Sequence, residues 1–208
     1  MVRPALCIAP AFLLLPFAHC GGGSAPAPAD DNSPPVVEIR EYMGERLHST
    51  NDMRENSIRG PQPVDIESWR LSIEGLVDSP REFTYDDLLA RVRVKRIVWV
   101  HCVDGWSAKI LWEGFSLREL LDEVGARNEA RYAVFHGADG FHNYLTVSFI
   151  RVNDIIVAHH ANGAPLRENR GFPLHVVAQS KYGYKWCKWL TRIVLTDSAD
   201  GTGYYENS

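Results

Sequence analysis

The clearest pattern along the chain is a set of short segments in which apolar and polar residues alternate or β-branched residues gather. Residues 69–77 (WRLSIEGLV) alternate, and this pattern predicts a strand with one buried face. Residues 93–103 (RVKRIVWVHCV) are rich in β-branched and aromatic side chains, which favour strands. The same composition predicts four further strands, at 132–136, 143–149, 174–177 and 190–196.

Two segments carry the signals of short helices. Residues 84–90 (TYDDLLA) begin with a Thr that can cap a helix, and Asp87 follows three positions later. Residues 116–124 (SLRELLDEV) repeat this arrangement with Ser116 and Glu119. Because predicted strands outnumber predicted helices, we expect an α+β fold, mainly strand, built as a single domain.

The first 35 residues differ in composition from the rest. Arg3 and the apolar run at 5–18 resemble an export signal, and the run is too short to span a bilayer. Cys20, followed by Gly-Gly-Gly-Ser, resembles a bacterial lipoprotein box, although Phe17 and His19 depart from it. Simple cleavage near this point and a retained anchor are the alternatives. We therefore expect a protein that is exported, either periplasmic or lipid-anchored to a bacterial envelope membrane.

The expected organisation has three parts: a signal or lipoprotein-like segment at 1–20, a flexible linker at 21–35 rich in Pro, Ala, Asp and Ser, and a folded domain at 36–208.

Composition and charge exclude several classes of protein. The 208 residues are 45% hydrophobic and 23% charged, which is typical of a soluble globular chain and excludes disorder. Lys and Arg number 22 against 26 Asp and Glu, a net charge of −4, so no nucleic-acid partner is expected. Six Trp and eight Tyr suit ligand pockets as well as cores.

Cys102 is the first candidate for chemistry. It lies at the end of a predicted strand, just before an Asp-Gly turn and Trp106, where a side chain can face a cleft. By residue type alone, an unpaired Cys is more often a small buried hydrophobic residue. A disulfide with Cys187 is sterically possible, but nothing in the sequence indicates it.

Residues 171–193 form a second candidate region, in which cations and aromatic rings surround Gly183. A phosphate-bearing planar ligand needs such cations, ring faces and backbone N–H groups. A solvated, basic strand edge is the alternative. The cations and rings are Lys181, Lys185, Lys188, Arg192, Tyr182, Tyr184, Trp186 and Trp189.

Four ordered motifs resemble a known family, the molybdopterin-dependent oxidoreductases of the sulfite oxidase fold. This family includes sulfite oxidases and the periplasmic methionine sulfoxide reductase catalytic subunit. The resemblance extends from about residue 39 to 205 and implies the sulfite oxidase-type molybdopterin-binding fold. The motifs are Cys102 with Gly105-Trp106-Ser107 and Trp112-x-Gly114; Asn162-Gly163 with Pro165-Leu166; Gly171-x-Pro173-Leu174; and 182–189 (YGYKWCKW).

The resemblance implies a molybdenum-molybdopterin cofactor and assigns residues to it. It implies that Cys102 is the sole protein ligand of the metal, a role that suits a soft thiolate donor. It implies that Lys185 and Lys188 contact the pterin phosphate. The remaining residues implied to bind the cofactor are Asn51, Arg54, Asn56, Asn162, Tyr182, Gly183 and Tyr184.

His175 departs from the family pattern, which commonly has Arg after the Gly-x-Pro-Leu motif. We expect His175 to act at the catalytic site, near the substrate. Histidine offers no fork of donors and ordinarily changes charge near pH ~6.5, so tight binding of an oxyanion is disfavoured. A neutral sulfoxide or N-oxide is therefore expected to be a better substrate than sulfite.

The resulting hypothesis is an exported molybdenum enzyme that performs oxygen-atom transfer on a small-molecule substrate. A separate electron-transfer protein, membrane-bound or soluble, is the expected redox partner; no haem is expected, because the sequence has no Cys-x-x-Cys-His motif. We expect a monomer. Two alternatives stay open: an enzyme with Cys102 as nucleophile and a His as base, and a binding module that kept the fold without the cofactor.

Overall fold

The computed structural model describes residues 37–199. The chain divides into two units, residues 1–32 and 33–208, and the described residues all belong to the second. The expected signal segment, Cys20 and the linker at 21–35 lie outside the described residues, so they stay predictions. Between residues 37 and 199, none of the helices has the length and apolar character needed to cross a membrane.

Two five-stranded sheets and a small separate hairpin make up the strands of residues 37–199. The first sheet contains β5 (Val94–His101), β6 (Ser107–Ser116), β9 (Ile156–Ala161), β10 (Ala164–Pro165) and β11 (His175–Val177). The second sheet contains β3 (Leu71–Gly75), β4 (Arg81–Phe83), β7 (Tyr132–Gly137), β8 (His142–Thr146) and β12 (Leu190–Thr196). The hairpin consists of β1 (Glu41–Tyr42) and β2 (Glu45–Arg46).

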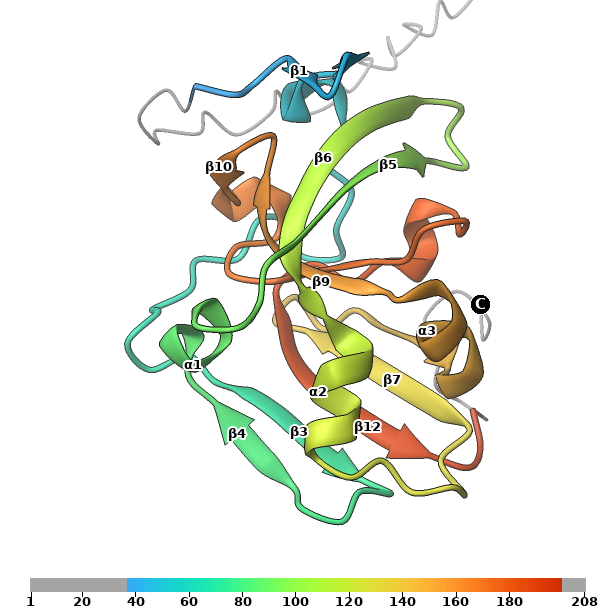
Figure 1. The fold of residues 1–208 in the computed structure, drawn as a ribbon. Coiled ribbons are helices and arrows are strands. Elements are labelled where there is room, and N and C mark those ends of the chain that lie inside the picture. Colours follow the sequence, from blue (N-terminus) through green and yellow to red (C-terminus); the bar gives the residue numbers. More distant parts are fainter. Residues whose placement is uncertain (1–36, 200–208) are drawn as a thin grey trace, which may run out of the picture. The chain divides into compact units, whose positions relative to one another are not determined.

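The strand order joins distant parts of the chain. The first sheet has the order β10-β9-β6-β5, with β11 also paired to β9, and its neighbours are antiparallel. The second has the order β4-β3-β12-β7-β8, and there β12 runs parallel to β3 while the other pairs are antiparallel. In Figure 1 the β5–β6 hairpin lies at the top and the second sheet at the bottom.

The helices of the described part are short. They are α1 (Tyr85–Leu89), α2 (Leu117–Glu123), α3 (Val147–Asn153) and the 3₁₀ turns η1 (Thr50–Asp52), η2 (Glu168–Arg170) and η3 (Gly183–Lys185). The two predicted helices are confirmed, and the predicted α+β, mainly strand class is confirmed with them.

The caps of the two predicted helices differ. Thr84 and Asp87 form the expected reciprocal pair, in which each backbone N–H donates to the other side chain at 2.9 and 3.1 Å. The expected cap at Ser116 is wrong, because the Ser116 hydroxyl donates instead to the Asp154 carboxylate at 2.6 Å. Burial of three leucines on α2 (Leu117, Leu120 and Leu121) stabilises that helix without the cap.

The strand predicted at 143–149 is only partly right. β8 ends at Thr146, and α3 begins at the next residue. The Thr146 hydroxyl accepts a hydrogen bond from the backbone N–H of Phe149 at 3.2 Å, which caps the helix. β-branched residues near position 147 therefore lie in a helix that tertiary packing stabilises.

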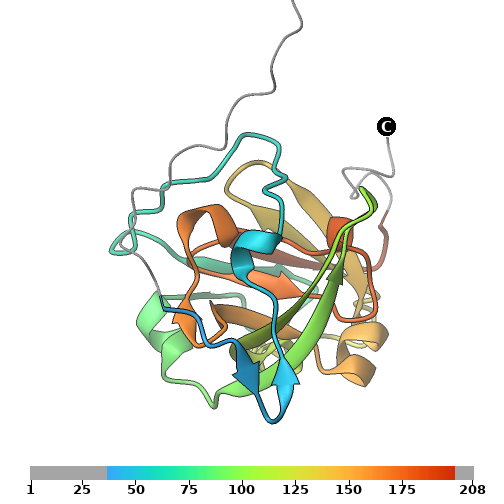
Figure 2. The ribbon, with the colours of Figure 1, turned by 90° about the horizontal axis from the view of Figure 1, so that it is seen from above.

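β6 is central to the first sheet, and the N-terminal segment lies along it. Figure 2 shows the β1–β2 hairpin beside β6, and the His48 N–H donates to the Lys109 carbonyl at 2.9 Å. On its other side β6 approaches β9 so closely at Gly114 that a Cβ there would overlap the carbonyl oxygen of Val157. These contacts fix the β5–β6 hairpin, whose tip contributes to the cavity described next.

Candidate functional site

A cavity of about 520 Å³ is lined by five segments that are distant in sequence. This volume lies within the range of cofactor and small-molecule sites, roughly 300 to 1,000 Å³. Its apolar lining consists of Met53, Ile58, Val100, Val103, Trp106, Phe141, Gly183 and Trp186. Its polar lining consists of Arg54, Asn56, Ser57, Cys102, Asp104, Asp139, Asn169, Arg170, His175, Tyr184 and Lys188.

Cys102 lies at the tip of the β5–β6 hairpin, directly after β5. Its backbone N–H donates to the Trp106 carbonyl at 3.0 Å, and Gly105, at φ +84°, donates back to the Cys102 carbonyl at 3.1 Å. Cys102 is half-buried and forms part of the cavity lining. Its thiol donates to the Asp104 carboxylate, with sulfur and oxygen 3.6 Å apart. The predicted position at the end of a strand is confirmed.

Cys187 has a different environment. Its thiol is fully buried and is not part of the cavity lining, and burial raises its pKa far above the ordinary value. Cys102 and Cys187 are both free thiols, so they do not form a disulfide.

Lys188 reaches the cavity from the end of the predicted phosphate-binding region. Its ammonium lies 2.6 Å from the Glu55 carboxylate and 4.5 Å from the centre of the Trp189 ring. Burial lowers the pKa of Lys188, and the hydrogen bond and charge of Glu55 oppose that shift. A cation held in this way is a suitable point charge for an anionic group in the cavity.

His175 is buried on the cavity wall between two tryptophans. Its ring meets those of Trp112 and Trp186 edge-on, with centroids 5.1 and 5.8 Å away. Its Nδ1 lies 3.2 Å from the Arg170 carbonyl, and since a carbonyl only accepts, Nδ1 carries the proton. Burial and the nearby charges of Lys188 and Arg170 together lower the pKa of His175 to about 3, although the hydrogen bond to the Arg170 carbonyl opposes the shift. The expected change of charge near neutral pH is therefore wrong, because the ring has no water to solvate its cation.

The structure brings together some of the predicted cofactor residues and leaves others outside the lining. Arg54, Asn56, Cys102, Gly183, Tyr184 and Lys188 line the cavity. Asn51, Asn162, Tyr182 and Lys185 do not. The Lys185 ammonium lies 3.1 Å from the Asn143 side-chain oxygen and 4.3 Å from the centre of the Tyr144 ring, so it contacts β8.

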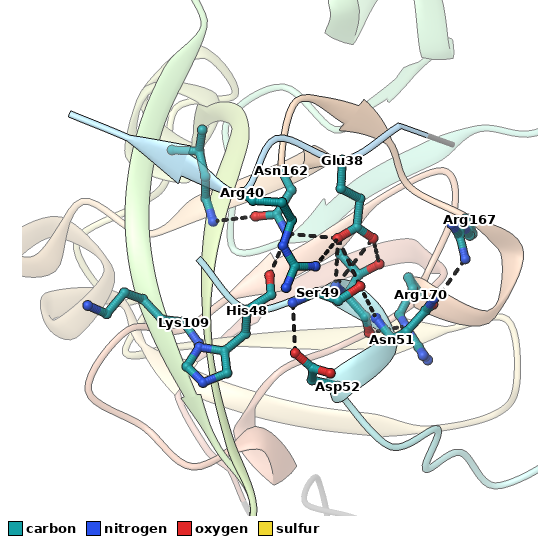
Figure 3. A network of polar contacts seen from close by, with 12 residues as sticks. Glu38, Arg40, His48, Ser49, Asn51, Asp52, Lys109, Asn162, Arg167 and Arg170 are labelled. Atoms are coloured by element: carbon teal, nitrogen blue, oxygen red, sulfur yellow. Dashed lines mark hydrogen bonds and ion pairs between the residues drawn. The ribbon is translucent and has the colours of Figure 1, made fainter. Parts of the chain in front are cut away.

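Asn162 belongs to a polar network that also contains Glu38, Ser49 and Arg170 (Figure 3). The side chain is fully buried; it accepts from the Leu111 N–H and donates to the His48 carbonyl and the Glu38 carboxylate. Glu38 also accepts from the hydroxyls of Ser49 and Thr50. Burial raises the pKa of Glu38, but the hydrogen bonds from Thr50, Asn162 and Ser49 outweigh it and leave the pKa below its ordinary value.

This network positions one wall of the cavity. It fixes η1, and η1 is followed directly by Met53, the first residue of the lining segment 53–58. Arg170, itself in the lining, donates to the Thr50 carbonyl at 2.9 Å from the other side. Asn162 therefore acts on the cavity through the backbone that it holds, and Asn51, a residue of η1, accepts a hydrogen bond from the Arg167 guanidinium at 3.0 Å.

Several lining residues are absent from the sequence-based set. Asp139 is buried, and its carboxylate accepts from the backbone N–H groups of Ile58 and Phe141 at 3.3 and 3.0 Å. Arg170 directly precedes the Gly171-x-Pro173 motif, and that position was the only available signal for it. Nothing in the sequence near Asp139 marks it as part of a site.

The chemistry of the lining fits a large, polar, anionic cofactor with a soft metal. The thiol of Cys102 is a soft donor, and Lys188 and Arg170 supply positive charge. Two further polar atoms at the cavity, the Trp106 Nε1 and the Asn169 side-chain oxygen, have no hydrogen-bond partner within residues 37–199. Buried donors and acceptors usually have partners, and these two atoms, which are closed to solvent in this structure, are exceptions.

The two sheets and the thiol-containing cavity between distant segments form an α+β domain with a site whose size and chemistry suit a bound cofactor. Residues 59–205 match the model of the oxidoreductase molybdopterin binding domain. The chain belongs to this family, and the sulfite oxidase-type fold predicted from the resemblance is confirmed.

Three relatives illustrate the family. The chain is 31% identical over 149 residues to an uncharacterized oxidoreductase, YuiH, of Bacillus subtilis, which covers 71% of this chain and 75% of that protein. It is 30% identical over 152 residues to the protein-methionine-sulfoxide reductase catalytic subunit MsrP of Ralstonia nicotianae, covering 65% of this chain and 46% of that one. The crystal structure of the sulfane dehydrogenase SoxCD from Paracoccus pantotrophus superposes with a TM-score of 0.64 and 26% identity, covering 67% and 41%. The chain thus spans less than half the length of the last two relatives.

Proposed function

We propose that this chain binds molybdopterin in the described cavity, with the Cys102 thiolate as the protein ligand of molybdenum, and reduces a small neutral oxygen-atom acceptor. The observation that carries the proposal is the position of the Cys102 thiol, half-buried in the wall of a cavity that also contains Lys188. Oxygen-atom transfer is the chemistry that the bound cofactor supplies. The following roles belong to the chain itself.

Cys102 and Asp104 handle one proton. The thiol donates to the Asp104 carboxylate, so Asp104 Oδ2 can accept the proton that Cys102 loses when the sulfur becomes a metal ligand. The tight turn at Gly105 holds both side chains at the cavity. Val100, Trp106 and Trp186 cover the same region with apolar surface and exclude water.

Lys188 and Arg170 supply positive charge for the phosphate of the cofactor, and Arg54, Asn56 and Tyr184 wall the heterocycle. Asn51 and Asn162 support that wall through η1. Tyr182 and Lys185 brace η3 rather than line the cavity; the rings of Tyr182 and Tyr184 stack with an interplanar angle of 14°. Their role is to hold Tyr184 in place.

His175 is the basis for proposing a neutral substrate. The neutral ring carries its proton on Nδ1, so Nε2 can only accept a hydrogen bond, and it gives an oxyanion no donor. Sulfoxides and N-oxides are neutral and tolerate such a site better than sulfite does. The name of the Ralstonia relative, a protein-methionine-sulfoxide reductase subunit, supports this class of substrate.

The partner and the location complete the proposal. We propose that the chain is exported, acts as a monomer and exchanges electrons with a separate electron-transfer protein, membrane-bound or soluble. A relative from Azospira oryzae, 32% identical over 144 residues, is named as a putative subunit of a protein-methionine-sulfoxide reductase, which supports a multi-protein system. The export-like composition of residues 1–20 supports the location.

The two alternative functions have less support. A Cys nucleophile needs a histidine base within hydrogen-bond reach, and within the described residues the Cys102 thiol hydrogen-bonds to Asp104. A cofactor-free binding module gives no role to the soft thiol of Cys102 at a cavity that is also lined by the Lys188 and Arg170 cations.

The decisive experiment measures molybdenum and pterin in protein purified from a molybdenum-replete host. We expect about one molybdenum per wild-type chain and loss of turnover in Cys102→Ser, with an unchanged circular dichroism spectrum, because a hydroxyl is a poor substitute for a soft thiolate. Cys187→Ala is the matched control and retains both metal and turnover. Wild-type protein without molybdenum, or a fully active Cys102→Ser variant, would overturn the proposal.

A further inference from the structure

We infer that Glu55 competes with the anionic group of the cofactor for the Lys188 ammonium, so that Glu55 sets how tightly the cofactor is held. This inference rests on the proposed function, because the anion in question is the pterin phosphate. It concerns a carboxylate that neither the sequence motifs nor the family match assigns to the site.

The position of the Lys188 ammonium is fixed by its surroundings. The Lys188 side chain is 19% exposed, and its stem packs so closely on Gly171 that a Cβ there would lie 3.0 Å from the lysine Cβ. The Trp189 ring lies under the ammonium at 4.5 Å. Because the stem is packed against these groups, the ammonium stays at the cavity when its counter-ion changes.

Glu55 is the movable member of the pair. It lies in the segment 53–58, which follows η1 and contains no regular secondary structure. Its side chain is 29% exposed, and its neighbours Arg54 and Asn56 both line the cavity. A carboxylate on such a segment can leave the ammonium at the cost of one ion pair and of the hydrogen bond from the Ser57 hydroxyl at 3.1 Å.

A phosphate and the Glu55 carboxylate repel each other when both approach one ammonium. Asp139 adds a further negative charge near Lys188 and Arg170 a further positive one, so the repulsion that a phosphate meets at the ammonium comes mainly from Glu55, 2.6 Å away. Arg54 and Arg170 are the other cations of the lining, and the Nε of Arg170 donates to the Thr50 carbonyl. Binding of the phosphate at Lys188 therefore displaces Glu55.

Linkage fixes the sign of the effects. The free energy by which the Glu55–Lys188 pair stabilises the cofactor-free protein is the free energy that the cofactor must overcome on binding. Removing the charge of Glu55 should thus lower the stability of the cofactor-free protein and raise its affinity for the cofactor. Substitution of a residue that only maintains the fold would lower both the stability of the protein and its affinity for the cofactor.

The test compares Glu55→Gln with wild type in two preparations. In loaded protein, the rate at which molybdenum is lost on dilution should fall by about tenfold, the effect of one charge-assisted hydrogen bond. In protein from a host that cannot make the pterin, Glu55→Gln should lower the melting temperature. In a Lys188→Met background, the further change Glu55→Gln should leave the rate of molybdenum loss unchanged.

Glu45→Gln is the matched control. Glu45 pairs with Lys109 at 2.7 Å, and that ammonium also lies over a tryptophan, Trp99, at 5.3 Å, but both residues are outside the cavity lining. The control should leave molybdenum loss unchanged. If loaded Glu55→Gln loses molybdenum as fast as wild type, or faster, the competition is wrong while the proposed function stands. If wild-type protein holds no molybdenum, the proposed function fails and this inference fails with it.

Discussion

Burial decides what His175 can do. The same residue on a surface would be a pH-dependent cation, but between Trp112 and Trp186 its pKa is lowered to about 3 and it stays neutral. An arginine in this place would be a buried cation beside Lys188 and Arg170, without a carboxylate partner at hand. The histidine is therefore a packed hydrogen-bond acceptor rather than a shorter arginine.

The pH profile tests this view of His175. With sulfoxide as substrate, kcat/KM between pH 5 and 8 should show no step that disappears in His175→Gln, because the ring is neutral across this range. The His175→Gln substitution should change KM or kcat by the same factor at every pH between 5 and 8. A step near pH 6.5 in wild type that is missing from His175→Gln would show that the ring titrates and that its environment is wetter than described.

Lys188 and Lys185 provide a second test at the scale of residues. Lys188→Glu should remove most of the molybdenum from purified protein, because it places a negative charge in the cavity beside Glu55. Lys185→Glu should reduce the molybdenum-to-protein ratio much less, because Lys185 contacts Asn143 and Tyr144 instead. Equal losses in both variants would mean that Lys185 also faces the phosphate.

Among the elements, β6 determines the shape of the site. Its pairing with β5 forms the hairpin that carries Cys102, and its pairing with β9 shifts register between Glu113 and Gly114. Trp112, just before that shift, is fully buried and packs edge-on against His175. A substitution at the point where β6 meets β9 should therefore alter the packing of the cavity wall.

Gly114→Ala tests this close approach. The added Cβ would overlap the backbone of Val157, so the strands must separate, and we expect a loss of about 2 to 4 kcal/mol in the free energy of unfolding. Gly105→Ala is the control: its Cβ would have no atom within 4 Å, and only the positive φ of +84° costs energy, about 1 kcal/mol. Urea unfolding of both variants measures the difference, and equal losses would exclude the steric explanation.

The predictability of the elements follows from how local their causes are. β12 was predicted with its observed bounds, and α1 with its cap, because alternation and capping depend on neighbouring residues. β6 and β9 escaped prediction: their burial patterns are nearly continuous rather than alternating, since both lie in the interior of the first sheet. α3 escaped because tertiary packing overrides the strand preference of Val147 and Phe149.

For the whole molecule, the site shows the same division between local and distant causes. Motifs in the sequence located Cys102 and Lys188, since each lies in a recognisable block. They could not show that Asp139 and Arg170 would join them, because these contacts depend on how the sheets pack. Nor could they separate Lys185 from Lys188, because the orientation of η3 decides which lysine reaches the cavity.

Buried neutral histidines should make the whole molecule sensitive to acid. The pKa values of His159 and His175 are lowered mainly by burial, to about 4 and about 3, whereas in the unfolded chain both protonate near 6.5. Between these limits the unfolded chain binds more protons, so the stability present above pH 6.5 is lost as the pH falls toward 3. Each group contributes a slope of about 1.4 kcal/mol per pH unit.

Urea unfolding at several pH values measures this loss. His159→Gln should make the decline between pH 6 and 4.5 shallower, because one proton no longer binds on unfolding. His101→Gln, at an exposed position, is the control and should leave the slope as it is in wild type. An unchanged slope in His159→Gln would mean that His159 is already protonated in the folded protein.

The parallel pairing of β3 with β12 has a consequence for how the protein is made. β3 is near the start of the described part and β12 near its end, so the second sheet cannot close until β12 has been synthesised. The last stretch of cavity wall, 183–188, also emerges late from the ribosome, just before β12. A ligand therefore has no complete cavity to bind until all of residues 71–196 have been synthesised, and we expect the proposed cofactor to be inserted only after the second sheet has closed.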